Sequence, residues 1–409
     1  KVSLSDDGNT LAVSALLEDS PSYGINCNQD NYEVTSYASV SSSSGASASS
    51  DPSNAFIEAV SYNVGVVYLF NRTGADWTQN AYIKPHYSLE HLTISEGLRF
   101  GETLALSGDG KTLAVGTTSD ALAKSGIINF NASQSSSTSS RSECLDFYPP
   151  VSSSTGSSVS SSSSSKSSSS KSGSSTSSYN GGAGSGAVYI YRLEADGWKE
   201  DSHLKASNAQ SGDAFGVSIA LSHDGKTLAI GAVGEDSNAV GANGDQSINA
   251  CYYVADDGTI TVDATCTEAS RRFYRGLLDN GAAYVFINNG QDWTQEAYLK
   301  ASTAFWNTRF GYSVDVSGDG TTLAVGAPGD ASKSNTVNGD SAQSIDYTNT
   351  GAAYIFKKAG TTWSQEAFIK PSTLTRHSGV SLVNNGNGTG SIQVQDGGEF
   401  GGNVSLSQD

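Results

Sequence analysis

The sequence predicts an all-β protein built from tandem four-stranded antiparallel units. The main observation is a phrase that occurs four times, in which an Asp-Gly pair separates two short apolar runs. Its copies are VSLSDDGNTLAVSA (2–15), LALSGDGKTLAVGT (104–117), IALSHDGKTLAIGA (219–232) and VDVSGDGTTLAVGA (314–327). Asp-Gly between two apolar runs is a strong hairpin signal. Each copy therefore predicts the first and second strands of one unit.

Two further phrases supply the third and fourth strands. The third-strand phrases are GVVYLF (65–70), GAVYIY (186–191), GAAYVF (281–286) and GAAYIF (351–356). The fourth-strand phrases are AYIKP (81–85), SHLKA (202–206), AYLKA (297–301) and AFIKP (367–371). Repeated four-stranded units that cannot bury both faces alone are typical of β-propeller blades. We therefore predict a β-propeller with four full repeats.

A tryptophan stands nine residues after the tyrosine of every third-strand phrase. These residues are Trp77, Trp198, Trp293 and Trp363. A large aromatic side chain at the same place in every unit fills the gap between neighbouring sheets. We interpret all four as inter-blade packing residues rather than as a platform for a ligand.

The repeats cover 1–409 and place the blades at 2–84, 100–205, 214–300 and 310–370, followed by a surplus first strand at 399–407. The surplus strand has two interpretations: the array continues beyond this sequence, or the strand pairs with a neighbouring subunit. The extra length falls almost entirely between the second and third strands, as inserts 16–64, 118–185, 233–280 and 328–350. Equivalent connections should leave one face of the propeller.

Phe-Gly precedes each later first strand, and one unit runs from Phe310-Gly311 to Gly326-Ala327-Pro328. This punctuation resembles the FG-GAP repeat of the integrin alpha-chain-like β-propeller family. The resemblance implies an extracellular propeller used for adhesion and protein contact, often with a calcium loop in the first hairpin. Here the hairpins keep only the central Asp of that loop, at Asp7, Asp109, Asp224 and Asp319. One carboxylate cannot supply the ligands that calcium takes, so these residues are interpreted as turn formers and no cofactor as required.

Charge and hydropathy limit the classes of partner that we expect for this protein. Lys and Arg number 23 against 41 Asp and Glu, a net charge of −18, which argues against nucleic-acid binding. No apolar run is long enough to span a bilayer. The inserts also share a polar phrase whose carboxylates could surround a hard cation, although turns in which each Asp bonds its own backbone are the favoured interpretation. The candidate cation ligands are Asp236, Asp245, Asp330 and Asp340.

Several features indicate an oxidising, extracellular setting. Cys251 and Cys266 lie in one insert and are predicted to pair; Cys27 and Cys144 could pair between neighbouring inserts, with free thiols as the alternative. Glycosylation triplets begin at Asn71, Asn131, Asn387 and Asn403. The low-complexity insert 133–180 contains a serine tract from Ser152 to Ser178. It fits either a flexible linker or a mucin-like segment with O-linked sugars.

The sequence contains no recognisable catalytic motif, and its five His are scattered. We therefore expect no enzyme. The expected function is an extracellular structural or adhesive glycoprotein, a building block of a surface filament, appendage or wall layer that contacts itself or neighbouring structural proteins. The alternative is an adhesion receptor ectodomain that binds a protein or glycan through its loops. Trp306, outside the repeated Trp position, is the best single candidate for such a contact, unless it simply packs.

Overall fold

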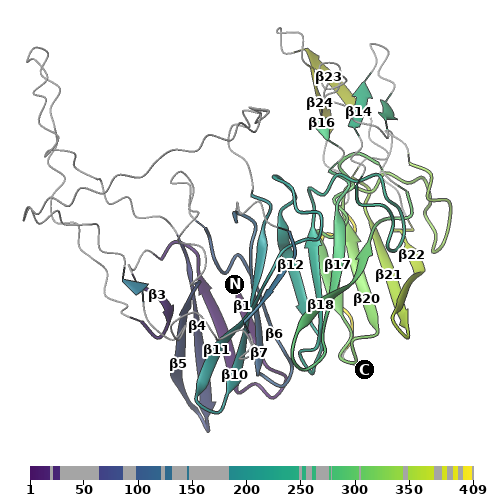
Figure 1. The fold of residues 1–409 in the computed structure, drawn as a ribbon. Helices are drawn as coiled ribbons and strands as arrows, with labels where there is room; N and C mark the ends of the chain where they lie inside the picture. The colour runs from purple at the N-terminus through teal and green to yellow at the C-terminus, as the bar shows by residue number, and fades with distance from the viewer. Residues whose placement is uncertain are drawn as a thin grey trace, which may run out of the picture.

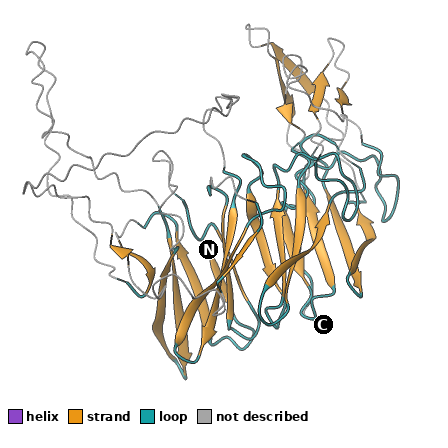
Figure 2. Cartoon of the chain, viewed as in Figure 1, coloured by secondary structure: helices purple, strands orange, loops and turns teal. Residues whose placement is uncertain are grey.

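The computed structural model describes residues 1–18, 22–27, 64–85, 98–120, 125–130, 145–146, 184–247, 251–254, 260–263, 276–277, 279–303, 305–343, 349–372, 380–384, 390–394 and 399–407. Within these ranges every regular element is a β-strand (Figure 2). No described segment is a helix long and apolar enough to cross a membrane.

Four antiparallel sheets form a β-propeller array in chain order (Figure 1). Blade 1 contains β1 (Val2–Leu4), β2 (Thr10–Ala15), β4 (Val66–Thr73) and β5 (Asp76–Lys84). Blade 2 contains β6 (Thr103–Leu106), β7 (Thr112–Thr117), β10 (Ala187–Glu194) and β11 (Gly197–Leu204). Blade 3 contains β12 (Phe215–Leu221), β13 (Thr227–Ala232), β17 (Ala282–Asn288) and β18 (Trp293–Leu299). Blade 4 contains β19 (Ser313–Val316), β20 (Thr322–Ala327), β21 (Ala352–Ala359) and β22 (Thr362–Ile369).

The Asp-Gly hairpins are closed by the Ser and Asp of their own sequence. In blade 4, Ser317 Oγ donates to Asp319 Oδ1 at 2.6 Å, and the same oxygen accepts the backbone N–H of Thr321 at 3.0 Å. Gly320 follows with φ +71°, a conformation that glycine adopts without strain. The Ser and backbone hydrogen bonds also lower the pKa of Asp319. The carboxylate is therefore used to form the turn.

Three buried apolar clusters lie between consecutive blades. The Phe of each Phe-Gly pair is central to them: Phe310 meets Tyr354 and Phe356 edge-on, with ring centroids 5.2 and 6.1 Å apart. The backbones of the two blades also approach each other closely here. Gly281, which has φ +78°, forms a β-bridge with Phe310, and a Cβ on Gly281 would lie 2.1 Å from the Phe310 carbonyl oxygen. Blade stacking therefore depends on both an aromatic residue and the lack of a side chain at the glycine.

The tryptophans do not all pack between blades as predicted. Trp198, Trp293 and Trp363 are 4, 1 and 2 % exposed, whereas Trp77 is 42 % exposed. The difference arises because each buried Trp packs against the preceding blade, and no described blade precedes blade 1. For Trp77 the predicted packing role is therefore wrong in this structure.

The inserts add outer strands that the four-strand prediction missed. β3 (Ser22–Ile25) pairs with β5, and β8 (Ile127–Asn129) pairs with β11. β3 also pairs with β9 (Leu145–Asp146). In blades 1, 3 and 4 an insert Asn with positive φ exchanges two hydrogen bonds with the backbone of the fourth strand. These pairs are Asn26 with Tyr82, Asn243 with Tyr298 and Asn338 with Phe368.

Other strands lie beyond the upper end of the blades in Figure 1. β14 (Cys251–Val254), β15 (Ile260–Asp263) and β16 (Gly276–Leu277) form one sheet, and β23 (Val380–Asn384) pairs with β24 (Gly390–Val394). The second hairpin follows a fourth strand, so inserted length is not confined to the connection between the second and third strands. Second and fourth strands of an antiparallel blade end on the same side, which explains why both groups lie there.

Residues 399–407 take the position of a first strand but form no strand ladder in the structure. Leu406 N–H donates to Asp315 Oδ2 at 2.6 Å, as Leu106 N–H donates to Ser3 Oγ at 3.0 Å between blades 1 and 2. Ser313 Oγ donates to the Gly401 carbonyl at 2.9 Å. The segment therefore sits on blade 4 as the first strand of another blade would.

Candidate functional site

Every blade contains a buried ion pair between its fourth strand and the residue three positions after its second strand. The lysines end or directly follow the fourth strands, and the acids begin the inserts. The pairs are Lys84–Glu18 at 2.7 Å, Lys205–Asp120 at 2.9 Å, Lys370–Asp330 at 2.9 Å, and Lys300–Glu235. All four lysines are at most 5 % exposed. We call each pair, together with the residue before the Gly that precedes the third strand, a blade network.

The blade networks are held by further hydrogen bonds. In blade 4 the Lys370 ammonium donates to Thr350 Oγ1 at 2.8 Å, and the Tyr354 hydroxyl donates to Asp330 Oδ2 at 2.9 Å. Burial by itself raises the pKa of Asp330, but the Lys370 charge and hydrogen bonds from Ser332 and Gln343 lower it overall. Asp330 is therefore an ionised, fully satisfied carboxylate.

Blade 2 gathers residue types that also serve in hydrolases. His203 Nε2 lies 3.6 Å from Asp120 Oδ2, and the Lys205 ammonium donates to Ser185 Oγ at 2.7 Å. All four side chains are buried, with exposures of 1 to 4 %. A nucleophile must reach its substrate, and this serine is shielded by the blade. The arrangement fits a structural network.

Carboxylates are crowded around the blade 3 network. Burial, with Glu235 and Asp236 nearby, raises the pKa of Asp213 to about 8. Burial, with Asp279 and Glu235 nearby, raises the pKa of Asp236 to about 7. Both carboxyls accept a backbone hydrogen bond, from Gln210 and Asp279 respectively. This region therefore responds to pH in a range where most carboxyls do not.

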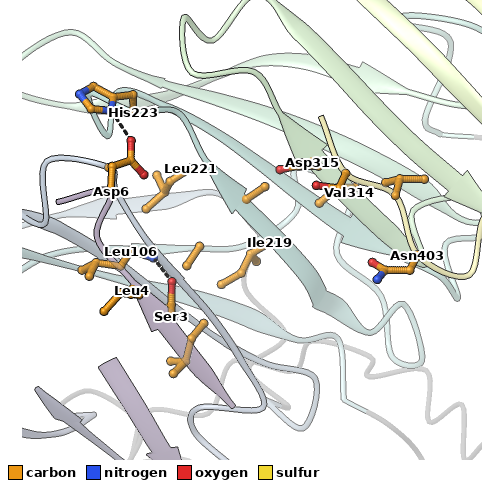
Figure 3. Close-up of a pocket in the computed structure, with 16 residues that line it drawn as sticks. Ser3, Leu4, Asp6, Leu106, Ile219, Leu221, His223, Val314, Asp315 and Asn403 are labelled. Carbon is orange, nitrogen blue, oxygen red and sulfur yellow. Dashed lines mark hydrogen bonds and ion pairs between the residues drawn. The ribbon is translucent and has the colours of Figure 1, made fainter. Parts of the chain in front are cut away.

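Residues from the first strands of all four blades, together with residues 403–405, line one pocket (Figure 3). At one end Asp6 of blade 1 reaches across to His223 of blade 3, with 2.6 Å between Oδ2 and Nδ1. Neighbouring hairpins are also joined there by backbone hydrogen bonds, from Asp6 N to Gly108 O and from His223 N to Gly318 O, both at 3.0 Å. The histidine takes the place of the glycine found in two of the other hairpins, which is what lets this pair form.

The junctions between blades 2 and 3 and between blades 3 and 4 each use a tryptophan and an acid. Trp293 Nε1 donates to Asp201 Oδ2 of blade 2 at 2.8 Å, and Trp363 Nε1 donates to Glu296 Oε2 of blade 3 at 2.9 Å. Lys358 of blade 4 also reaches Glu296, at 2.8 Å. The junction between blades 3 and 4 thus combines an indole and a cation on one side with a carboxylate on the other.

The two outward blade faces carry between them the groups that meet at the junction of blades 3 and 4. On blade 1, Arg72 lies over the exposed Trp77 ring, 5.9 Å from its centroid, in the positions that Lys358 and Trp363 occupy in blade 4. On blade 4, Glu366 is exposed and stands where Glu296 stands in blade 3. One outward face therefore presents the basic and aromatic half of a blade junction, and the other presents the acidic half.

The FG-GAP repeat family matches residues 198–249 and 293–356. The matched regions fall within blades 2 to 4 and include the Phe310-Gly311 and Gly326-Ala327-Pro328 punctuation. These two regions of the chain are FG-GAP repeats. A search of curated proteins found no match.

The four candidate cation ligands of this FG-GAP protein lie apart in separate contacts. Asp330 belongs to the blade 4 network, and Asp236 bonds the Asp279 backbone. Asp245 and Asp340 each accept a backbone N–H two residues ahead, from Ser247 at 2.8 Å and Ala342 at 2.9 Å. Within the described residues no group of three His, Cys, Asp or Glu side chains is arranged to hold a metal ion.

The predicted modification sites are only partly described. Asn71 lies in β4, paired with Thr10 and Thr78, and not in the loop where the sequence placed it. Asn403 is exposed and outside any ladder, which corrects its predicted strand position. Asn131, Asn387 and the serine tract 152–178 lie outside the described residues. Trp306 is half-buried and packs against Phe305, with ring centroids 6.2 Å apart.

The cysteine pairings stay predictions. Cys27 is 6 % exposed and forms a disulfide whose partner is outside the described side chains. Only the backbone of Cys251 is described, in β14, where it pairs with Asp263 and Leu277. Cys144 and Cys266 lie outside the described residues.

Sequence reasoning missed the blade networks and the outward-face charges. The signals were present: a lysine in each fourth-strand phrase, and an acid three residues after each second strand. They were overlooked because a charged residue at the edge of an apolar phrase is normally solvated.

Proposed function

We propose that this FG-GAP protein is a non-enzymatic structural or adhesive component of an extracellular surface, and that it assembles with further copies through its outward blade faces. FG-GAP repeats typically occur in extracellular domains, which supports the location. The observation that carries the assembly is the complementary pair of faces: Arg72 and Trp77 on one side, and Glu366 on the other.

The proposed contact repeats a junction that the molecule already makes. Trp363 and Lys358 engage Glu296 between blades 3 and 4. Trp77 and Arg72 would engage Glu366 of a second copy in the same way. Such a contact joins different faces of the two copies, so it extends in one direction instead of closing a symmetric dimer.

The segment 399–407 fits this assembly. Its residues Val404–Ser407 have the sequence VSLS, which is also the sequence of Val2–Ser5. On docking, it would lie beside β2 of the incoming copy and take the place of β1. Exchange of one VSLS strand for the other would keep β2 paired and would give 399–407 a partner strand.

Negative-stain imaging of native material, with the intact mass of the same sample, tests the functional proposal. Filaments or sheets whose subunit mass exceeds 42.2 kDa because of attached sugar would support a glycosylated structural component. Discrete particles of unmodified mass would overturn it and favour the receptor alternative, in which loops capture a protein or glycan. Ligand arrays would then be the next experiment.

A further inference from the structure

The blade 3 network differs chemically from the other three. Lys300 Nζ donates both to Glu235 Oε2 and to the side-chain carbonyl Oδ1 of Asn280. In blades 2 and 4 the residue at the Asn280 position is a hydroxyl side chain, Ser185 or Thr350. In blade 1 it is Val64. Blade 3 is thus the one blade in which an amine meets both a carboxamide and a separate carboxylate.

These three groups are buried. Lys300, Glu235 and Asn280 are 1, 1 and 2 % exposed. Burial lowers the pKa of Lys300, although the nearby carboxylates oppose the shift. A desolvated lysine that gives up its proton more readily is a better nucleophile. The low exposure also keeps water away from the reacting carbon.

Surrounding hydrogen bonds fix each group. Asn280 Nδ2 donates to the Ser237 carbonyl at 3.0 Å, which leaves Oδ1 directed at the lysine. Glu235 Oε1 accepts from Asn208 Nδ2 at 2.8 Å, so Oε2 stays beside Lys300. The antiparallel pairing of β17 with β18 brings together the two chain positions, 20 residues apart. Holding reactants in contact replaces a bimolecular encounter with an intramolecular step.

We propose that Lys300 and Asn280 join in an intramolecular isopeptide bond, with Glu235 carrying the proton. Glu235 accepts a proton from the Lys300 ammonium, and the freed electron pair of Nζ attacks Cγ of Asn280. The Nζ–Cγ bond forms. Glu235 then returns the proton to Nδ2 and takes a second proton from Nζ, which is cationic after the attack. The Cγ–Nδ2 bond breaks, and ammonia leaves and carries the second proton away as ammonium. The exchange of one amide for another needs no oxidant, reductant or cofactor, and it ties the start of β17 covalently to the end of β18.

Peptide mass spectrometry of the full chain, expressed without glycosylation, reduced and denatured, tests the bond. Trypsin cleaves after Arg275, Lys300 and Arg309, so an unmodified chain releases peptide 276–300. An amide on Lys300 blocks that cleavage, giving peptide 276–309 with a mass lower by about 17 Da because ammonia is lost. A second protease that cuts before Asp292 should leave the two fragments joined in one ion. Release of 276–300 at its sequence mass would overturn the proposal.

Three variants test the roles of Asn280, Lys300 and Glu235 one at a time. Asn280→Thr copies the blade 4 network and should release unmodified 276–300 from a folded protein, as judged by circular dichroism. Lys300→Arg should also lack the joined ion. Glu235→Gln keeps the shape but cannot carry the proton, and should reduce the joined fraction at least tenfold. If Glu235→Gln forms the bond fully, the proton-carrier role is wrong although the bond stands. Lys205, which Ala206 follows, is an internal control that trypsin should cleave in every sample.

Discussion

The indole of Trp293 in blade 3 donates a hydrogen bond to the carboxylate of Asp201 in blade 2, with 2.8 Å between Nε1 and Oδ2. Trp363 makes the same contact with Glu296 one blade further along. A residue that is part of one sheet thus completes the surface of the preceding one. Blade order is fixed by these directional contacts as well as by the apolar clusters.

Replacing a buried tryptophan should cost far more than replacing the exposed one. Trp293→Ala removes a side chain that is 1 % exposed and should lower the free energy of unfolding by about 3–5 kcal/mol. Trp77→Ala, at a residue 42 % exposed, should cost under about 1 kcal/mol in the dilute protein. Urea unfolding followed by circular dichroism measures both, and equal losses would show that the Trp positions are not inter-blade anchors.

Breaking a blade network should leave a charge buried without its partner. Asp330→Leu or Lys370→Met alone should each cost about 3–5 kcal/mol, while the double variant should recover much of that loss. The exposed pair Lys199–Asp196 supplies the control, because Lys199→Ala should leave the free energy of unfolding unchanged. Additive losses at Asp330 and Lys370 would mean that the two residues do not act as a pair.

Stability should fall as the pH rises from about 4 to about 8. Burial raises the pKa of Asp213 to about 8 and that of Asp236 to about 7. The folded protein therefore holds protons that the unfolded chain releases near pH 4, and raising the pH favours unfolding. Asp120 and Asp330, whose pKa values are lowered, act oppositely but only below that window.

Thermal midpoints measured from pH 5 to pH 8.5 test this direction. Asp213→Asn removes one of the titrating groups and should flatten the decline. Asp245→Asn changes an exposed carboxylate whose pKa is lowered by hydrogen bonds with Ser247, so it should leave the slope as in the parent protein. A midpoint that rises across this range would contradict the assigned burial of Asp213 and Asp236.

Alanine substitutions at Gly281 and Gly290 should distinguish a steric clash from the cost of an unfavourable backbone conformation. Both have positive φ, +78° and +97°, but a Cβ on Gly281 would lie 2.1 Å from the Phe310 carbonyl oxygen, whereas one on Gly290 would meet nothing within 4 Å. Gly290→Ala should cost roughly 1 kcal/mol for its backbone conformation, and Gly281→Ala several times that. Similar losses in chemical denaturation would remove the argument for close blade contact at Gly281.

The blade strands and the Phe-Gly pairs between them could be predicted because the same short sequence phrases recur in every repeat. Ser, Asp and Gly close each hairpin locally. A Phe-Gly pair such as Phe310-Gly311 marks each junction between blades. Such features depend on residues that are close in the sequence, so a single sequence is enough to predict them.

The rest depended on contacts between distant residues. Repetition predicts the same environment for Trp77 and Trp293, and only the three-dimensional array shows that no described blade covers Trp77. The Asp6–His223 contact joins residues 217 positions apart. Asn280 precedes a third strand, and only the fold brings it to Lys300, which also contacts Glu235. Neither contact leaves a local pattern in the sequence.

Sedimentation velocity of the purified chain over a range of concentrations tests the proposed face-to-face assembly most directly. We predict species larger than 42.2 kDa that grow with concentration and are lost in Trp77→Ser. Arg72→Glu and Glu366→Arg should each weaken assembly, while the chain carrying both changes should regain it, because the charges are then exchanged across the contact. A single 42.2 kDa species at every concentration, unchanged by these substitutions, would contradict the account.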